Sequence, residues 1–378
     1  MDFGFSEEQE MLRNMSRDFL ANECPSTYVR EMMDDERGFT DAFWRKMAEL
    51  GWMGLALPEA HGGSGLSFVD LIVVLEEMGR VVAPGPFFST VVLGGTALLE
   101  AGSDAQQQEF LPKLATGDLR VTLANLEPSG RWDADGITLS ATEKGGGWVL
   151  SGTKLFVPDA LCADLLIVVG RQPGSSGEGG LGLFLVDAKA AGVSITPLKT
   201  MDQTRKLAEV SFADVAVPAE RVLGDVGAGW ALLERISDRG KVGLCAEMCG
   251  GAEKVLEMSV EYAKVREQFG KPIGSFQAIQ HKCANMLVEV ESSKSVTYYA
   301  AWAVANDVDE APLAAAMAKA YCSDAYRHTA GEGIQIHGGI GFTWEHDMHL
   351  YFKRAKSSEV TFGDATWNRE RVAQLIDL

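Results

Sequence analysis

Residues 262–286 read YAKVREQFGKPIGSFQAIQHKCANM, and this stretch decides how the C-terminal half of the chain is organised. The helical spacing before it stops at Arg266, Lys271 and Pro272 then make a turn, and Ser275 caps a new helix. An arginine at a corner between two helices is placed to hold an anion such as a pyrophosphate. A second interpretation stays open, in which the corner is a plain helical hairpin with an exposed arginine.

A second stretch, residues 331–356, reads GEGIQIHGGIGFTWEHDMHLYFKRAK. Gly338, Gly339 and Gly341 would let a backbone approach a flat or phosphorylated ligand closely. A single GGxG pattern has low specificity, and this one lacks the preceding strand and following helix of a dinucleotide-binding fingerprint. The pattern alone therefore does not identify a ligand.

Outside these two stretches, the pattern of apolar and turn-forming residues changes twice along the chain. The first third is helical and begins with a capping box at Ser6 and Gln9. Residues 121–225 contain short Val-, Leu- and Phe-rich runs separated by Gly, Pro, Ser and Asp, which is typical of strands and turns. After Gly227 helical periodicity returns and continues to the end. The predicted fold is mainly α with an inserted β domain, and the predicted domains are residues 1–120, 121–225 and 226–378.

The bulk composition excludes some classes of partner. The 378 residues contain 34 Lys and Arg against 53 Asp and Glu, a net charge of −19, which disfavours nucleic acids and anionic membranes but not a small anion held by local cations. Six scattered cysteines without a CxxC pair are typical of free thiols in a reducing compartment. We expect no signal peptide, no membrane span, no metal site and a cytoplasmic location.

Together the two stretches resemble the signature regions of the acyl-CoA dehydrogenase family, and the resemblance covers essentially the whole chain. It implies an N-terminal α domain, a middle β-barrel-like domain and a C-terminal four-helix bundle, assembled as a tetramer with FAD between subunits. It further implies that one subunit holds FAD through Arg266, Gln268 and Phe269, that Gln277 lies near the adenine, and that a neighbouring subunit contributes Gln335, Gly338 and Gly339.

The reaction that the resemblance implies is α,β-desaturation of an acyl-CoA thioester, with electrons passed to an electron-transfer flavoprotein-type acceptor. A carboxylate removes the α-proton and the β-hydrogen leaves as hydride to FAD. Hydrogen bonds from the flavin ribityl hydroxyl and from a backbone N–H stabilise the charge on the thioester carbonyl. We expect the backbone N–H at or beside Phe362 to be this donor, because an amide does not depend on the side chain that it carries.

The carboxylate is missing from the two positions that the family uses. The stretch VTFGDAT, residues 360–366, places Phe362 at one of them, and Gly240 occupies the other. On a helix, residues 240, 244 and 247 share a face, so Glu247 faces the substrate if Gly240 does. We predict that Glu247 is the base and that Asp238, Gly240 and Leu244 contact the substrate. The alternatives are a structural Glu247 paired with a cation, Asp364 as the base, or no base.

The flavin side departs from the family as well. The stretches NLEPSGRWD, residues 125–133, and FVPD, residues 156–159, replace the usual Thr and Ser contacts with Leu126, Trp132 and Pro158. Backbone contacts from Leu126 and Phe156 would survive these changes. Similar departures mark the branch of the family that acts on bulky, ring-containing or steroid-side-chain thioesters. Two alternatives therefore remain: a catalytically silent partner subunit of a heteromeric acyl-CoA dehydrogenase, and a flavoenzyme of the same fold that acts on a non-CoA substrate. The assembly that the resemblance implies is a homotetramer or a heterotetramer with a related subunit.

Overall fold

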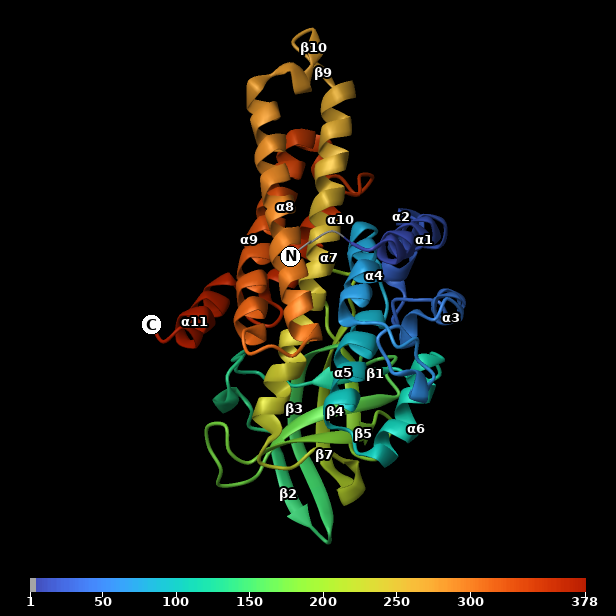
Figure 1. Ribbon diagram of the computed structural model, residues 1–378, viewed down its shortest axis with the longest axis vertical. Helices are drawn as coiled ribbons and strands as arrows, with labels where there is room; N and C mark the ends of the chain where they lie inside the picture. The colour runs from blue at the N-terminus through green and yellow to red at the C-terminus, as the bar shows by residue number, and fades with distance from the viewer. Residues whose placement is uncertain (1–4) are drawn as a thin grey trace. The chain divides into compact units, whose positions relative to one another are not determined.

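The computed structural model describes residues 5–378, and the chain divides into two compact units. The first unit contains residues 5–30, 68–83 and 241–378, and the second contains residues 31–67 and 84–240. Helices are the main element and strands are confined to residues 121–223 and to a small hairpin, which confirms the predicted fold class (Figure 1). The predicted boundaries at residues 120 and 225 stay a prediction. Across residues 5–378, no helix is both long and apolar enough to cross a membrane.

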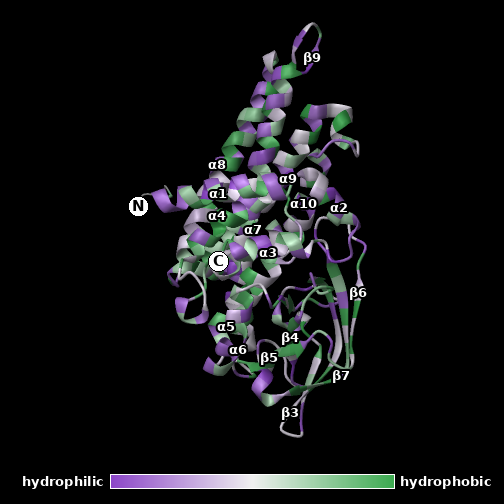
Figure 2. Ribbon diagram, turned by 90° about the vertical axis from the view of Figure 1, so that its right-hand side faces the viewer, coloured by the Kyte–Doolittle hydropathy of each residue, from purple (hydrophilic) through white to green (hydrophobic). Residues whose placement is uncertain are grey.

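The first unit is a helical bundle. Its long C-terminal helices are α7 (Gly229–Val265), which begins in the second unit, α8 (Gln277–Ala305) and α9 (Ala311–His337). The remaining helices of this unit are α1 (Glu7–Glu23), α4 (Phe68–Arg80), α10 (Met348–Val360) and α11 (Ala365–Leu375). The predicted capping box starts α1, with the Ser6 hydroxyl accepting from the Gln9 amide. Nearly every residue of α4 is buried. Its sequence is mostly apolar, as the hydropathy colouring in Figure 2 indicates.

The second unit combines a sheet with short helices. The strands are β1 (Val121–Ala124), β2 (Ser140–Lys144), β3 (Gly147–Pro158), β4 (Leu165–Arg171), β5 (Leu181–Asp187), β6 (Val193–Pro197), β7 (Leu207–Pro218) and β8 (Val222–Leu223). Their order is β6-β7-β3-β2-β4-β5-β8, and β1 pairs with β4 in parallel. The helices are α2 (Ser26–Asp34), which starts in the first unit, α3 (Asp41–Glu49), α5 (Thr96–Ala101), α6 (Asp104–Ala115) and a π-helical turn at Phe88–Gly95.

The sheet encloses its own apolar core. Strands β4 and β5 are buried along almost their whole length, because both faces are covered, and they read as continuous apolar runs rather than alternating ones. Phe184, Val168 and Leu150 are fully buried in this core, and Trp148 packs on Phe184 with ring centroids 5.4 Å apart. The Gly- and Ser-rich segment 172–180 connects β4 to β5 as a loop.

Candidate active site

Helix α7 carries the predicted base and the predicted substrate contacts. Asp238 is half-buried, and Gly240 and Leu244 are buried. The helix is unbroken through these positions, so residues 240, 244 and 247 keep the spacing that places them on one face. The side chain of Glu247 is only 7% exposed, which is unusual for a carboxylate and shows that it is enclosed by protein.

Helices α4 and α7 touch through their backbones beside Glu247. A Cβ atom added at Gly79 of α4 would lie 2.0 Å from the Glu247 carbonyl oxygen, and one added at Gly250 would lie 1.8 Å from the Glu76 carbonyl oxygen. Both glycines are therefore needed for this close approach. The crossing places Glu247 at a point where neither helix can shift without moving the other.

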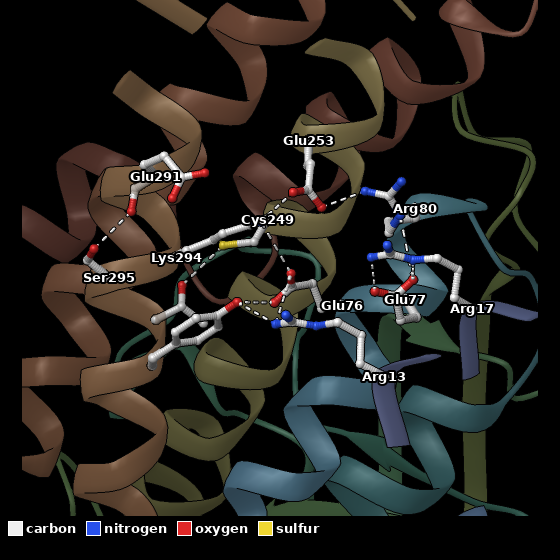
Figure 3. A network of polar contacts seen from close by, with 12 residues as sticks. Arg13, Arg17, Glu76, Glu77, Arg80, Cys249, Glu253, Glu291, Lys294 and Ser295 are labelled. Carbon is white, nitrogen blue, oxygen red and sulfur yellow. Dashed lines mark hydrogen bonds and ion pairs between the residues drawn. The ribbon is translucent and has the colours of Figure 1, made fainter. Parts of the chain in front are cut away.

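The neighbouring carboxylates of this crossing belong to an ion-pair network (Figure 3). The Arg17 guanidinium donates two hydrogen bonds to Glu77, at 2.9 and 2.7 Å, and Glu77 is 1% exposed. Burial raises the pKa of Glu76, which accepts a hydrogen bond of 2.6 Å from the Tyr298 hydroxyl. Lys294 lies between Glu76 and Glu253 and forms ion pairs with both. These groups tie α1, α4, α7 and α8 together.

The loop between α10 and α11 holds the other base position that the resemblance implies. Phe362 is 5% exposed and its side chain cannot accept a proton. Asp364 is the N-cap of α11, and its Oδ1 accepts a hydrogen bond of 2.8 Å from the Trp367 amide. Asp364 therefore already has a structural role, which favours Glu247 over Asp364 as the base.

The corner after α7 is a short β-hairpin rather than the predicted turn. Strands β9 (Glu267–Gln268) and β10 (Lys271–Pro272) pair, and Phe269 and Gly270 make the turn with φ of 53° and 77°. Two successive positive φ angles match the turn that suits the twist of a two-residue hairpin. The prediction that Lys271 and Pro272 form the turn was wrong, because the pairing of the strands places them in β10.

The predicted cap of α8 was also wrong. Ser275 lies in a 3-10 turn, Ile273–Ser275, and its hydroxyl donates to the Pro272 carbonyl at 2.7 Å. The N-cap of α8 is Phe276, whose side chain makes no capping hydrogen bond. The extra turn satisfies Ser275 before the helix begins.

The hairpin exposes groups that suit an anionic, aromatic ligand. Arg266 is exposed, and no residue between 5 and 378 forms an ion pair with it. Phe269 is 93% exposed at the tip of the hairpin, and Gln277 is exposed at the start of α8. Gln268 donates its Nε2 hydrogen to the Glu267 carbonyl at 2.6 Å. An unpaired guanidinium beside an exposed aromatic ring fits a dinucleotide's pyrophosphate and bases.

The glycine pair after α9 lies at the same end of the bundle. The His337 ring stacks on Tyr262, near the end of α7, with centroids 4.5 Å apart. Gln335 is exposed, Gly338 has φ of 63°, and a Cβ added at Gly338 or Gly339 would meet no atom within 4 Å. The backbone here is open to a ligand, so these residues also fit FAD.

In the second unit, the predicted flavin contacts Leu126 and Phe156 are adjacent. The amide of Leu155 donates to the Leu126 carbonyl at 2.9 Å. Phe156 sits at an irregularity in the β3–β7 pairing, with φ of 53°, and its side chain is 49% exposed. A bulge of this kind redirects a side chain out of the sheet. The structure thus brings both backbone positions to one place.

Sequence reasoning missed the buried lysines. Lys154 is fully buried below the NLEP segment, where it donates to Glu127 Oε1 at 2.6 Å and to the Asn125 carbonyl at 3.1 Å. Lys241, beside Gly240, is 4% exposed and lies over the Trp367 ring at 5.3 Å. Lys319 of α9 is fully buried as well. The available signal was a lysine on the apolar face of each element, which usually means a buried partner.

The chain matches three family models that together span nearly its whole length. Residues 6–118 match the acyl-CoA dehydrogenase N-terminal domain, residues 122–215 match the middle domain, and residues 227–376 match the C-terminal domain.

Two curated relatives show the range of similar proteins. The chain is 34% identical to the acyl-CoA dehydrogenase IpdE2 of Mycobacterium tuberculosis, over 93% of this chain and 92% of that protein. It is 31% identical to CarC, a subunit of the caffeyl-CoA reductase-Etf complex of Acetobacterium woodii, over 92% of this chain and 93% of that protein.

Solved structures agree over the full length. The ChsE4-ChsE5 complex from Mycobacterium tuberculosis contains a chain with a TM-score of 0.90 and 30% identity, over 100% of this chain and 99% of that one. An acyl-CoA dehydrogenase complexed with FAD from Bacillus anthracis has a TM-score of 0.92 and 27% identity, over 100% of this chain and 68% of that one. The three domain matches, the full-length fold and the site together place this chain in the acyl-CoA dehydrogenase family, whose members are FAD-dependent oxidoreductases.

Proposed function

We propose that the protein desaturates an acyl-CoA thioester between Cα and Cβ, with Glu247 as the base. The supporting observation is a carboxylate, 93% enclosed by protein, on the α7 face that includes Gly240 and Leu244. The family's two usual positions hold Gly240 and Phe362, which cannot take a proton, and Asp364 already caps a helix. An enclosed carboxylate at a fixed helix crossing suits proton abstraction from a weak carbon acid.

The proposed reaction breaks two C–H bonds and forms one carbon–carbon π bond. Glu247 takes the α-proton, the electron pair of that C–H bond forms the Cα–Cβ double bond, and the β-hydrogen leaves with its own electron pair. FAD held by Arg266, Gln268 and Phe269 would supply the acceptor for that hydride. The amide at or beside Phe362 donates to the thioester carbonyl and stabilises the negative charge that develops on its oxygen. Asp238 contacts the CoA end of the substrate, and Gly240 and Leu244 shape the face of α7 along which the acyl group lies.

FAD would be held at three places in the assembled protein. Arg266, Gln268, Phe269 and Gln277 present a cation, amides and an aromatic ring at the bundle end. Gln335, Gly338 and Gly339 offer an open backbone from a neighbouring subunit, and Leu126 and Phe156 contact the ring system. Exposure of Phe269, at 93%, supports a subunit interface at this hairpin, as in the tetramers of the family.

The electron acceptor would be an electron-transfer flavoprotein. The similarity to CarC, a subunit of a reductase-Etf complex, supports this assignment. A protein that passes electrons to such an acceptor gives much faster turnover with it than with dissolved oxygen. Turnover that is equally fast with oxygen alone would contradict this part of the proposal.

The base is tested with Glu247→Gln, which keeps the volume of the side chain but cannot accept the proton. The holoenzyme variant should bind FAD and acyl-CoA normally and lose at least about a hundredfold in the rate of flavin reduction. Glu261→Gln is the matched control, because Glu261 is an exposed residue of α7 that pairs only with Lys264 in the described chain. Flavin bleaching by Glu247→Gln at the wild-type rate would place the base elsewhere.

A second candidate is a catalytically silent subunit of a heteromeric enzyme, and the similarity to a chain of the ChsE4-ChsE5 complex favours keeping it. The visible spectrum of the protein purified alone separates the two. Flavin at one FAD per chain or per two chains, bleached by an acyl-CoA, supports the enzyme. A colourless protein that gains activity only with a related subunit supports the silent partner. Flavin reduced only by a non-CoA substrate would instead support the same-fold alternative.

A further inference from the structure

The loop that follows α10 has a backbone conformation that its sequence does not favour. Phe362 and Gly363 both have positive φ, 59° and 82°. For a bulky residue such as Phe362 the left-handed region is disfavoured, because its Cβ atom crowds the following carbonyl oxygen. Gly363 cannot be replaced by a larger residue without displacement, because a Cβ there would lie 2.6 Å from the Trp367 ring. Such a conformation persists only where surrounding groups hold it, and it is found at functional sites.

Two buried side chains hold this loop. The Lys319 ammonium of α9 is fully buried and donates to the Gly363 carbonyl at 2.9 Å, the Glu359 carbonyl at 3.0 Å and the Ser323 hydroxyl at 2.8 Å. The Asn368 Nδ2 of α11, also fully buried, donates to the carbonyls of Phe362 at 3.2 Å, Gly363 at 3.0 Å and Asp364 at 3.0 Å.

This arrangement fixes the peptide planes of the loop. In a trans peptide the N–H points away from the C=O of the same peptide unit. When Asn368 holds the Phe362 carbonyl, the Gly363 N–H therefore points away from Asn368. When Lys319 holds the Gly363 carbonyl, the Asp364 N–H points away from Lys319. Buried side chains donate hydrogen bonds to three successive carbonyls, those of Phe362, Gly363 and Asp364. These contacts do not use the backbone N–H donors on the opposite side of the loop.

We propose that Lys319 and Asn368 are positioning residues for the reaction, because they hold the carbonyls of Phe362, Gly363 and Asp364 and so aim the Gly363 amide, beside Phe362, at the thioester carbonyl. This role rests on the proposed desaturation. Neither side chain touches the substrate. A buried ammonium is a stronger donor than a neutral group, and that strength suits a strained loop. Loosening the loop would weaken a donor whose complete removal costs about 10²–10³ in rate.

The test compares Lys319→Met and Asn368→Asp with wild-type holoenzyme. Methionine keeps a straight, apolar side chain and loses the ammonium, and aspartate keeps the shape of asparagine and loses its donors. The control is Lys356→Met, since Lys356 lies on α10 close to the loop and, within residues 5–378, pairs only with the side chain of Glu359. The probe is 3-thiaoctanoyl-CoA, which has sulfur in place of Cβ. Its α-proton can be removed, but it has no β-hydrogen to transfer.

Two measurements are made. Hydrogen exchange followed by mass spectrometry on peptides covering residues 357–366 should be at least about tenfold faster in both variants and unchanged in the control. The apparent pKa of the bound analogue's α-proton, followed by its long-wavelength absorbance beside the flavin, should rise by at least about one, a tenfold loss of acidity. FAD content and the analogue's Kd should stay within about threefold of wild type, because binding does not depend on this charge.

The outcomes separate the two proposals. If the wild type acidifies the analogue and the variants acidify it equally well, the positioning role alone is overturned. Unchanged hydrogen exchange in the loop overturns the positioning role too. A wild type that binds the analogue without acidifying it overturns the desaturation and this role together. If Lys319→Met does not fold as holoenzyme, Asn368→Asp decides the question by the same two measurements.

Discussion

The contact between α4 and α7 predicts that Gly79→Ala is destabilising, although alanine favours helices. The added Cβ would lie 2.0 Å from the Glu247 carbonyl oxygen, whereas an ordinary contact is at least 3.4 Å. The helices would have to separate locally by roughly 1.4 Å, the difference between these distances. Overpacking of this kind costs about 1–3 kcal/mol. The gain of up to about 1 kcal/mol from replacing a helical glycine offsets only part of it.

The assay is thermal unfolding of the holoenzyme at one protein concentration and with saturating FAD, because subunit and cofactor binding both shift Tm. We expect a fall of up to about 4 °C, because the net cost is up to about 2 kcal/mol and each kcal/mol lowers Tm by about 2 °C in a large chain. Flavin reduction should slow as well, since the Glu247 backbone is the group that must move.

Gly331→Ala provides the matched control for this prediction. Gly331 lies inside α9, and a Cβ there would meet no atom within 4 Å. This variant should therefore gain about 0.5–1 kcal/mol from the lower entropy of alanine in the unfolded chain. If Gly79→Ala is stabilised to the same extent as Gly331→Ala, the close contact at Glu247 does not exist and the reasoning fails.

Two further predictions concern single cations. Arg266→Ala should raise the Kd for FAD about 10- to 150-fold, the equivalent of about 1.5–3 kcal/mol. Lys264→Ala, on the last turn of α7, should leave this Kd unchanged. Equal FAD content in the two variants would contradict the assignment of Arg266 to FAD binding. Burial lowers the pKa of Lys319 to about 8, against the opposing effect of Cys245 and Cys322. An unfolded lysine titrates near pH 10.4, so between about pH 8 and 10.4 the unfolded chain binds more protons and the Lys319 contribution to the free energy of unfolding rises with pH. The Tm of wild type relative to Lys319→Met should therefore rise from pH 7.5 to 9.5, and a constant difference would refute the pKa assignment.

The sequence by itself determined the features that depend on near neighbours. The capping box at Ser6 and the change from helices to strands near residue 121 were predicted, because capping and side-chain periodicity act over a few residues. Arg266 at the end of α7 was predicted for the same reason. The prediction failed at Ser275 and at the turn of the hairpin, where two short segments can satisfy the same residues in more than one way.

The tertiary structure decided what encloses the candidate site. Sequence spacing placed Glu247 on a face of α7, but only the fold shows that Gly79 brings α4 into backbone contact with it. Sequence spacing left Asp364 as an alternative base, and only the fold shows that it caps α11 by accepting a hydrogen bond from the Trp367 amide. Lys319 and Gly363 are 44 positions apart, and no local pattern links them. Buried polar groups find their partners through the packing of whole elements, so their roles follow from distances in space that sequence spacing does not encode.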